Sequence, residues 1–150
     1  MVNLLRNGSL VILLGVGLFM ACMSQTVLAN NARLTTQHIS GPVYAIIGEM
    51  GNRSAENLGN NANFGFIVGD TGVVLIDSGA GTQAAKAIEA EVGQTTSLPI
   101  TTVINTGGQD HRWLGNAYFA QQGARIIASS AAVADHDERA GDQIQGLTGA

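Results

Sequence analysis

Two short apolar runs separated by a tight turn constrain the fold of this chain more than any other feature. Phe64 to Val68 (FGFIV) and Val73 to Ile76 (VVLI) flank Gly69-Asp70-Thr71-Gly72, a turn with glycine at both ends. Strand-forming runs joined in this way predict a β-hairpin. The second run ends in Asp77-Ser78-Gly79-Ala80-Gly81, and residues 82–92 then carry apolar side chains at helical spacing. The chain therefore passes from a hairpin into an alternation of helices and strands.

The remaining pattern extends this alternation. Further strands are predicted at 43–48, 100–106 and 125–129, and further helices at 113–122 and from 131 to about 145. Ser130 can cap the last helix. Residues 30–40 indicate a polar lead-in, and residues 51–63, rich in Asn and Gly, indicate a polar loop. Strands alternating with helices favour a mixed sheet covered by helices, an α/β (α+β) fold in which reactive groups gather where strands end.

The first 29 residues predict a secretory signal peptide. Arg6 is the only charged side chain in the first 32 residues, Leu10 to Cys22 is an apolar run of signal-core length, and Val27-Leu28-Ala29 fits a cleavage site. An uncleaved anchor and lipid attachment at Cys22 are the alternatives. Cleavage after Ala29 would make the protein periplasmic or secreted, with membrane contact only through the signal peptide. The mature chain would then lack any thiol, because Cys22 is the only cysteine.

The charge of the mature chain argues against nucleic acid as a partner. Residues 30–150 hold six basic and eleven acidic side chains, a formal charge of −5, and an acidic chain repels a phosphate backbone. The length is sufficient to bury one modest core. A small-molecule substrate or ligand is a possible partner.

The segment 103–116, VINTGGQDHRWLGN, carries most of the chemistry in the sequence. A predicted strand runs into two glycines and then into five consecutive polar or aromatic residues. Asp110 and His111 are the candidate metal ligands, because carboxylate and neutral imidazole both suit zinc. Catalytic zinc generally takes three protein ligands and an open position for water, so two ligands are too few alone. Asp110, Gln109 and Arg112 are the candidate catalytic residues, since Gln109 or Arg112 could steady an oxyanion or hold an anionic group.

The residues of this segment also have purely structural interpretations. Gln109 fits a turn hydrogen bond, and Arg112 fits a salt bridge to Asp110 or to another nearby acid. Trp113 fits the packed start of a helix, although beside Arg112 it also suits stacking on a planar or anionic ligand.

Two histidines and one aspartate outside the segment favour structural or solvated roles over chemical ones. His38 lies in the polar lead-in, and His136 lies among Asp135, Asp137 and Glu138 on a helix expected to be exposed, so both should be solvated. Asp77 ends a buried strand, where its carboxylate can accept N–H bonds from the turn that follows. A structural role for Asp77 is favoured over a catalytic one.

The framework around the segment has a recognisable order. It consists of NFGFIVGDTGVVLIDSGAG, a helix, PITTVINT, a short loop, GNAYF and ARIIAS, over about residues 40–140. In this order it resembles the N-terminal half of the metallo-β-lactamase fold superfamily, with Asp77, Asn105, Gly115 and Asn116 as structural residues near the site. Members are mostly zinc-dependent hydrolases built as an αββα sandwich. The resemblance implies half of such a sandwich, a mixed sheet with helices on one face, and zinc as the cofactor.

The loop itself departs from that family. Members normally have His-x-His-x-Asp-His directly after Asn-Thr, where this chain has Gly-Gly-Gln-Asp-His-Arg. Aligned without a gap, the four motif positions hold Gly107, Gln109, His111 and Arg112. Shifted by one residue to match Asp-His, they hold Thr106, Gly108, Asp110 and His111. Either way the first two imidazoles are missing, and since glycine offers no donor and glutamine is a weak zinc ligand, the resemblance implies a partial metal site at best.

Length is a second departure, because the family's remaining metal ligands lie in a second half. We expect residues 30–150 to be a truncated N-terminal half, a gene fragment, or a protomer that self-associates through its uncovered sheet face. Two functional hypotheses follow. One is a secreted or periplasmic hydrolase-like protein with a depleted metal site and weak or no activity. The other is a non-catalytic ligand-binding member of the same fold or an inactive remnant.

Overall fold

The computed structural model describes residues 33–148 of the chain. The predicted signal peptide, its cleavage site after Ala29 and Cys22 lie outside these residues. Within the described part, no helix is both long and apolar enough to cross a membrane.

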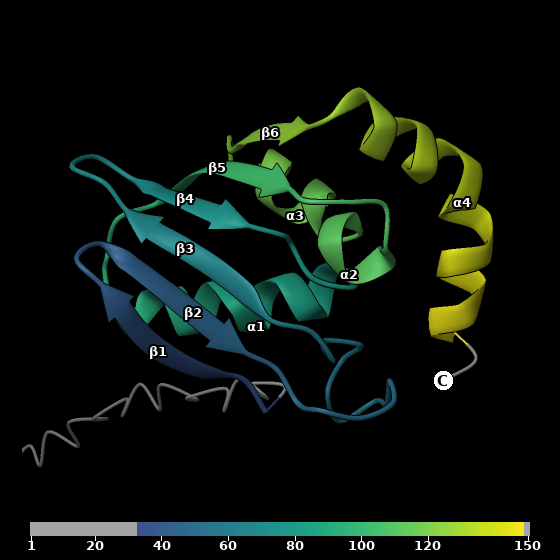
Figure 1. The fold of residues 1–150 in the computed structure, drawn as a ribbon, viewed down its shortest axis with the longest axis horizontal. Coiled ribbons are helices and arrows are strands. Elements are labelled where there is room, and N and C mark those ends of the chain that lie inside the picture. Colours follow the sequence, from purple (N-terminus) through teal and green to yellow (C-terminus); the bar gives the residue numbers. More distant parts are fainter. Residues whose placement is uncertain (1–32, 149–150) are drawn as a thin grey trace, which may run out of the picture.

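Six strands form one mixed sheet in the order β1-β2-β3-β4-β5-β6 (Figure 1). The elements along the chain are β1 (Thr35–Ser40), β2 (Val43–Ile47), β3 (Phe64–Val68), β4 (Val73–Ile76), α1 (Thr82–Gly93), β5 (Ile100–Asn105), α2 (Asp110–Trp113), α3 (Asn116–Gln121), β6 (Arg125–Ala128) and α4 (Ser130–Thr148). The first four strands pair antiparallel, whereas β4, β5 and β6 pair parallel. The parallel pairs bring the carboxyl ends of β4 and β5 to one edge of the sheet, where the site lies.

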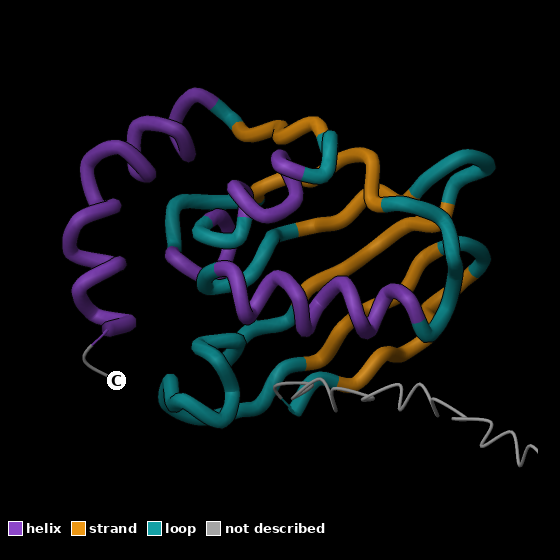
Figure 2. Tube along the Cα trace, turned by 180° about the vertical axis from the view of Figure 1, so that it is seen from behind, coloured by secondary structure: helices purple, strands orange, loops and turns teal. Residues whose placement is uncertain are grey.

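The core lies between the sheet and the helices on one of its faces. Alternate strand residues point toward this face, which includes the fully buried Ile46, Phe66, Leu75 and Val103. From α1 comes Ile88, which is also fully buried. Figure 2 shows α1 passing across the sheet on this side. The predicted mixed sheet with helices on one face is confirmed.

The opposite face of the sheet is apolar and uncovered within the described chain. Val43, Ile47, Ile67 and Ile127 are exposed by 38%, 36%, 38% and 36%. Val43 and Ile67 are direct cross-strand partners, so their side chains lie next to each other on this face. Figure 1 shows this side of the sheet, with α1 behind it. We call Val43, Ile47, Ile67 and Ile127 the uncovered sheet face.

The elements differ from the sequence prediction at three places. The segment predicted as a polar lead-in contains β1, which pairs with β2 and is fastened to α1 by a hydrogen bond of 2.8 Å from Thr36 Oγ1 to Glu91. The helix predicted at 113–122 is two short helices, because Leu114 and Gly115 interrupt it. The cap of α4 is Ser129 rather than Ser130, since Ser129 Oγ accepts the Ala132 N–H at 3.1 Å.

Candidate functional site

Asp77 connects the end of β4 to the beginning of the site loop. It is 5% exposed and adopts a positive φ of 63°, which is uncommon for a residue other than glycine. Its carboxylate accepts the backbone N–H and the hydroxyl of Thr106, both at 2.7 Å. We predicted bonds from the turn that follows Asp77, but the partner is instead Thr106, the residue after β5. Asp77 therefore positions the loop that begins at Thr106.

A close backbone approach holds α2 against the β4 turn. The Ser78 N–H donates to the Arg112 carbonyl at 3.0 Å, the Gly79 N–H donates to the His111 carbonyl at 2.9 Å, and the Gly115 N–H donates back to Gly79 at 2.9 Å. A Cβ atom at position 115 would lie 2.0 Å from the Ser78 carbonyl oxygen. Only glycine fits there, which gives the Gly-Asn pair of the sequence a physical reason.

Two asparagines complete this framework. Asn105 and Asn116 exchange side-chain hydrogen bonds of 3.0 and 2.7 Å, and Asn105 Nδ2 also donates to the Arg112 carbonyl at 2.5 Å. Asn105 is only 4% exposed, so its amide requires these partners. The pair fixes the distance between the end of β5 and the start of α3.

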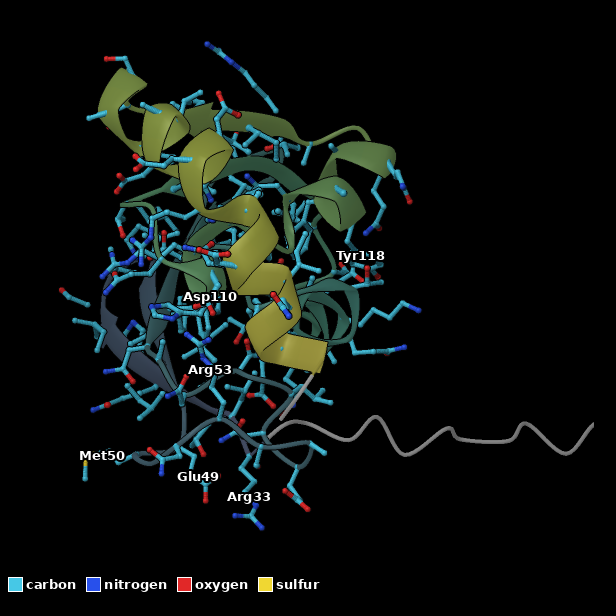
Figure 3. The ribbon with its side chains drawn as sticks, turned by 90° about the vertical axis from the view of Figure 1, so that its right-hand side faces the viewer. Arg33, Glu49, Met50, Arg53, Asp110 and Tyr118 are labelled. Atoms are coloured by element: carbon cyan, nitrogen blue, oxygen red, sulfur yellow. The ribbon has the colours of Figure 1, made fainter. Side chains whose placement is uncertain are left out.

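Asp110 is the most buried acid of the site and is paired with an arginine from a distant loop. Its side chain is 2% exposed. Arg53, in the loop between β2 and β3, donates from Nη2 to Asp110 Oδ1 at 2.6 Å, and Nη1 contacts Oδ2. The same Oδ1 accepts the His111 N–H at 2.7 Å. Figure 3 shows Arg53 and Asp110 next to each other beside α4. The charge of the buried Asp110 carboxylate is thus compensated by the partly exposed guanidinium of Arg53.

His111 lies beside Asp110 and is partly buried. Its Nδ1 is 3.2 Å from Asp110 Oδ1 and has no hydrogen-bond partner in the described part of the chain. Burial lowers the pKa of His111 below its ordinary value of 6.5, against the opposing influence of Asp110, and Arg112 and Arg53 lower it further. A lowered pKa keeps the imidazole neutral at pH 7, which is the form that could accept a hydrogen bond.

Arg112 is directed toward Asp77 rather than toward Asp110. Its Nε donates to Gln109 Oε1 at 2.5 Å, its Nη1 contacts Thr106 Oγ1, and the same Nη1 is 3.6 Å from Asp77 Oδ2. Arg112 was interpreted as half of a salt bridge to Asp110 or to another nearby acid. In the structure the acid within salt-bridge distance is Asp77. Gln109 and Arg112 hold each other in this arrangement.

Helix α4 lies over the two glycines of the loop. The Trp113 ring stacks on His136 with centroids 4.4 Å apart, and Trp113 Nε1 donates to Gln143 at 2.9 Å. Gln143 in turn donates to the Gly108 carbonyl at 2.8 Å, and His136 Nε2 is 3.1 Å from the Gly107 carbonyl. The expectation that His136 is solvated is wrong: it is 8% exposed, because it lies on the face of α4 that packs against α2. His38, by contrast, is exposed, as expected.

Two of the five side chains of the segment reach an open cavity. This polar cleft, of about 290 Å³, is lined by Arg53, Gln109, Asp110, Arg139, Asp142 and Gln143. His111, Arg112 and Trp113 are not part of its lining. One side of the Trp113 ring is taken by His136, which leaves less of the ring for stacking on a ligand. Of these five residues, only Gln109 and Asp110 therefore contribute to the polar cleft.

The donors at this loop do not make a zinc site. Gly107 and Gly108 carry no side-chain donor, the carboxylate of Asp110 is occupied by Arg53, and Gln109 Oε1 accepts from Arg112. Among residues 33–148, no group of three or more His, Cys, Asp or Glu side chains could hold a metal ion. A guanidinium at the carboxylate also repels a second cation. The zinc that the resemblance implied does not fit these residues.

Three residues of the site were not found from the sequence. Arg53 lies in a loop that was interpreted only as a turn region, and the one signal for it was a single cation in a long Asn- and Gly-rich stretch. His136 and Gln143 are seven residues apart, which places them on one face of a helix. That spacing was available in the sequence, but the three acids around His136 indicated solvent instead.

No protein-family model matches the sequence, and no curated protein sequence matches it either. Among solved structures, a metallo-β-lactamase from Pontibacter korlensis is similar with a TM-score of 0.58 and 17% identity, covering 72% of this chain and 49% of that one. The mono-zinc form of the metallo-β-lactamase FIM-1 from Pseudomonas aeruginosa is similar with a TM-score of 0.59 and 18% identity, covering 71% and 46%.

The sheet order and the one-sided helices define a mixed α+β fold with a polar loop at the end of β5. This fold is that of the metallo-β-lactamases, as the sequence resemblance implied. The chain spans about half the length of these two structures. At 17% and 18% identity, this similarity shows the fold alone.

Proposed function

We propose that this protein is a hydrolase-like member of the metallo-β-lactamase fold that holds no zinc at the β5 loop and uses the polar cleft to bind a small polar molecule. The observation that carries the proposal is the contact between Arg53 and Asp110. In this chain a guanidinium compensates the buried carboxylate, so no metal ion is needed for charge balance. Catalysis by metal-activated water is then weak or absent.

The lining of the polar cleft indicates the chemistry of its ligand. Arg139 and Asp142 are both exposed on α4 and give the cleft one charge of each sign, while Gln109 and Gln143 add amide groups. Arg53 is already paired with Asp110. Arg139, on α4, is therefore the remaining cation in the lining of the cleft. A small molecule with a carboxylate and a hydrogen-bond donor, such as an amino acid, fits this lining.

Metal analysis tests the first part of the proposal. Residues 30–150 are prepared in the presence of zinc, dialysed against metal-free buffer and analysed for bound metal. We expect less than about a tenth of an equivalent, because two side-chain donors of the usual three are missing. A full equivalent of retained zinc would show that the proposal is wrong.

A variant with restored imidazoles is the matched control for this measurement. Gly107→His with Gln109→His supplies two nitrogen ligands at the positions that the gapless alignment assigns to them. A Cβ at position 107 would lie 3.3 Å from Arg112 Cδ, a flexible side chain that can shift. We expect this variant to retain more zinc than the unchanged chain, which would show that the missing donors cause the low affinity.

Amide NMR tests the second part. Titration with a panel of small amino acids and dicarboxylates should shift the backbone signals of Gln109, Asp110 and Gln143, and Arg139→Ala should weaken the binding by about tenfold. Shifts confined to other regions of the protein would argue against the polar cleft as the binding site. The same titration with Arg125→Ala, an exposed cation on β6, should be unchanged.

We also propose that the protein acts in the periplasm or outside the cell. The support is the N-terminal pattern of a lone Arg6, an apolar run and Val27-Leu28-Ala29. N-terminal sequencing of the protein recovered from the producing cells should begin at Asn30. A retained Met1 would contradict cleavage.

A further inference from the structure

A second cavity, which we call the α1 cavity, lies beside the polar cleft and has a different character. It is about 370 Å³, within the range of cavities that bind small molecules. Three segments enclose it: the loop after β2, the turn before α1 with the first turn of that helix, and the end of α4. Leu58, Ala80 and Leu147 give it an apolar lining.

The apolar lining continues beyond the α1 cavity. An adjoining hollow of about 250 Å³ shares Ala80 and Leu147 with it and adds Leu114 and Ile144. Ile144 is 52% exposed, although it lies on the α4 face that borders this hollow. An apolar chain or ring that entered the α1 cavity could therefore extend along α4 and cover part of Ile144.

The charge at the α1 cavity is of one sign. Arg53 is the only charged side chain among the described residues that line it. Two of its terminal nitrogens face Asp110 on the cleft side, but a guanidinium has five N–H donors, so donors remain for a second partner. The first turn of α1 carries no acid and no side-chain cap. The positive end of this helix therefore adds to the preference for an anionic ligand that Arg53 creates.

From this combination we propose that the α1 cavity binds a small amphipathic anion, with its carboxylate at Arg53 and its apolar part against Leu58, Ala80 and Leu147. This site is separate from the polar cleft, although Arg53 lies between the two. An apolar cavity with a single charged residue at its margin selects for a ligand with one charged end. A fully polar molecule would leave the apolar lining unmatched.

Calorimetric titration of residues 30–150 with octanoate tests the proposal, with acetate and octanol as comparison ligands. Octanoate should bind saturably, and acetate and octanol should each bind at least about tenfold more weakly, because each lacks one of the two interactions. Acetate binding as tightly as octanoate would remove any role for the apolar lining. Octanol binding as tightly would remove the role of Arg53.

Gln83→Glu is the diagnostic variant. Gln83 is exposed and lines the α1 cavity, and an acid in the first turn of a helix favours folding. The new carboxylate should weaken octanoate binding about tenfold through repulsion. Thr71→Glu, in the exposed turn between β3 and β4, changes the net charge equally and should leave binding unchanged. Equal binding by the Gln83→Glu variant would overturn the proposal.

Arg139→Ala separates this proposal from the polar cleft. Arg139 lines the cleft but not the α1 cavity, so its removal should leave octanoate binding intact. If Arg139→Ala abolished octanoate binding while Gln83→Glu did not, octanoate would occupy the polar cleft and the α1 cavity proposal would fail. The proposal for the cleft would then stand unaffected.

Discussion

Arg53 and Asp110 are 57 residues apart in sequence and joined by a two-pronged ion pair, with the carboxylate almost fully buried and the guanidinium about one-third exposed. Such a pair joins the loop after β2 to the one-turn helix α2. Breaking it leaves an uncompensated charge inside the protein, which is far less favourable than the pair itself.

Arg53→Ala should therefore lower the free energy of unfolding by about 3–5 kcal/mol. The double variant Arg53→Gln with Asp110→Asn should recover much of this loss, because neither side chain is then charged. Arg33→Ala is the control: Arg33 pairs with Glu49 at 2.5 Å, but its side chain is 60% exposed, so its removal should change stability by less than about 1 kcal/mol. Urea denaturation measures all three, and equal losses for Arg53→Ala and Arg33→Ala would contradict the buried-charge argument.

Gln143 connects α4 to the site loop through both ends of its amide. It accepts from Trp113 Nε1 and donates to the Gly108 carbonyl. Gln143→Ala leaves both groups without their partner and should destabilise the protein by about 1–3 kcal/mol. Trp113 is the only tryptophan of the chain, so its fluorescence reports on this contact and should shift to longer wavelength. Gln121→Ala, at an exposed position of α3, should leave the emission unchanged, and an unshifted spectrum for Gln143→Ala would show that α4 is held by other contacts.

Local patterns predicted most of the fold. The hairpin at Gly69–Gly72, the helix after Asp77-Ser78-Gly79 and the strand before Asn105 all follow from apolar periodicity and glycine positions, which act over a few residues. β1 was missed because an edge strand needs few apolar residues: its hydrogen bonds come from β2, a tertiary partner that local composition does not reveal.

The site was predictable only in its position. That Asp110 lies in the loop region after a strand follows from the pattern, but its pairing with Arg53 depends on how a long polar loop folds back across the sheet edge. Likewise the burial of His136 arises from the docking of α4 on Trp113. Both contacts join segments more than 20 residues apart, and no local periodicity specifies such pairs.

The two faces of β3 should respond differently to substitution. Phe66 is fully buried against the helices, so Phe66→Ala should destabilise the protein by about 3–5 kcal/mol. Its neighbour Ile67 points to the uncovered sheet face and is 38% exposed, so Ile67→Lys should change stability by about 0.5 kcal/mol or less.

The Ile67→Lys variant also tests self-association through the uncovered sheet face. An exposed apolar face of this kind favours pairing with a second copy of the chain, so residues 30–150 should show concentration-dependent association in analytical ultracentrifugation. Ile67→Lys should weaken that association without unfolding the protein. A chain that stays monomeric at all concentrations would contradict self-association, and the stability difference between the two variants would still test the assignment of the faces.

Tyr118 provides a prediction on pH dependence. Burial raises the pKa of its phenol to about 12, with further contributions from the hydrogen bond of 2.5 Å to Glu89 and from the charge of that carboxylate. Since the ordinary value is 10.0, the unfolded chain loses this proton before the folded protein does. The contribution of Tyr118 to stability is therefore complete below pH 10 and is lost as the pH rises toward 12.

Absorbance of the phenolate in a Tyr44→Phe background follows Tyr118 alone, because the chain has two tyrosines. Glu89→Gln should move the titration midpoint downward, toward 10, since the amide carries no charge to oppose ionisation of the phenol. Glu138→Gln removes an exposed acid on α4 and should leave the midpoint unchanged. A midpoint near 10 in the Tyr44→Phe protein itself would mean that the phenol is solvated and that its contact with Glu89 does not persist in solution.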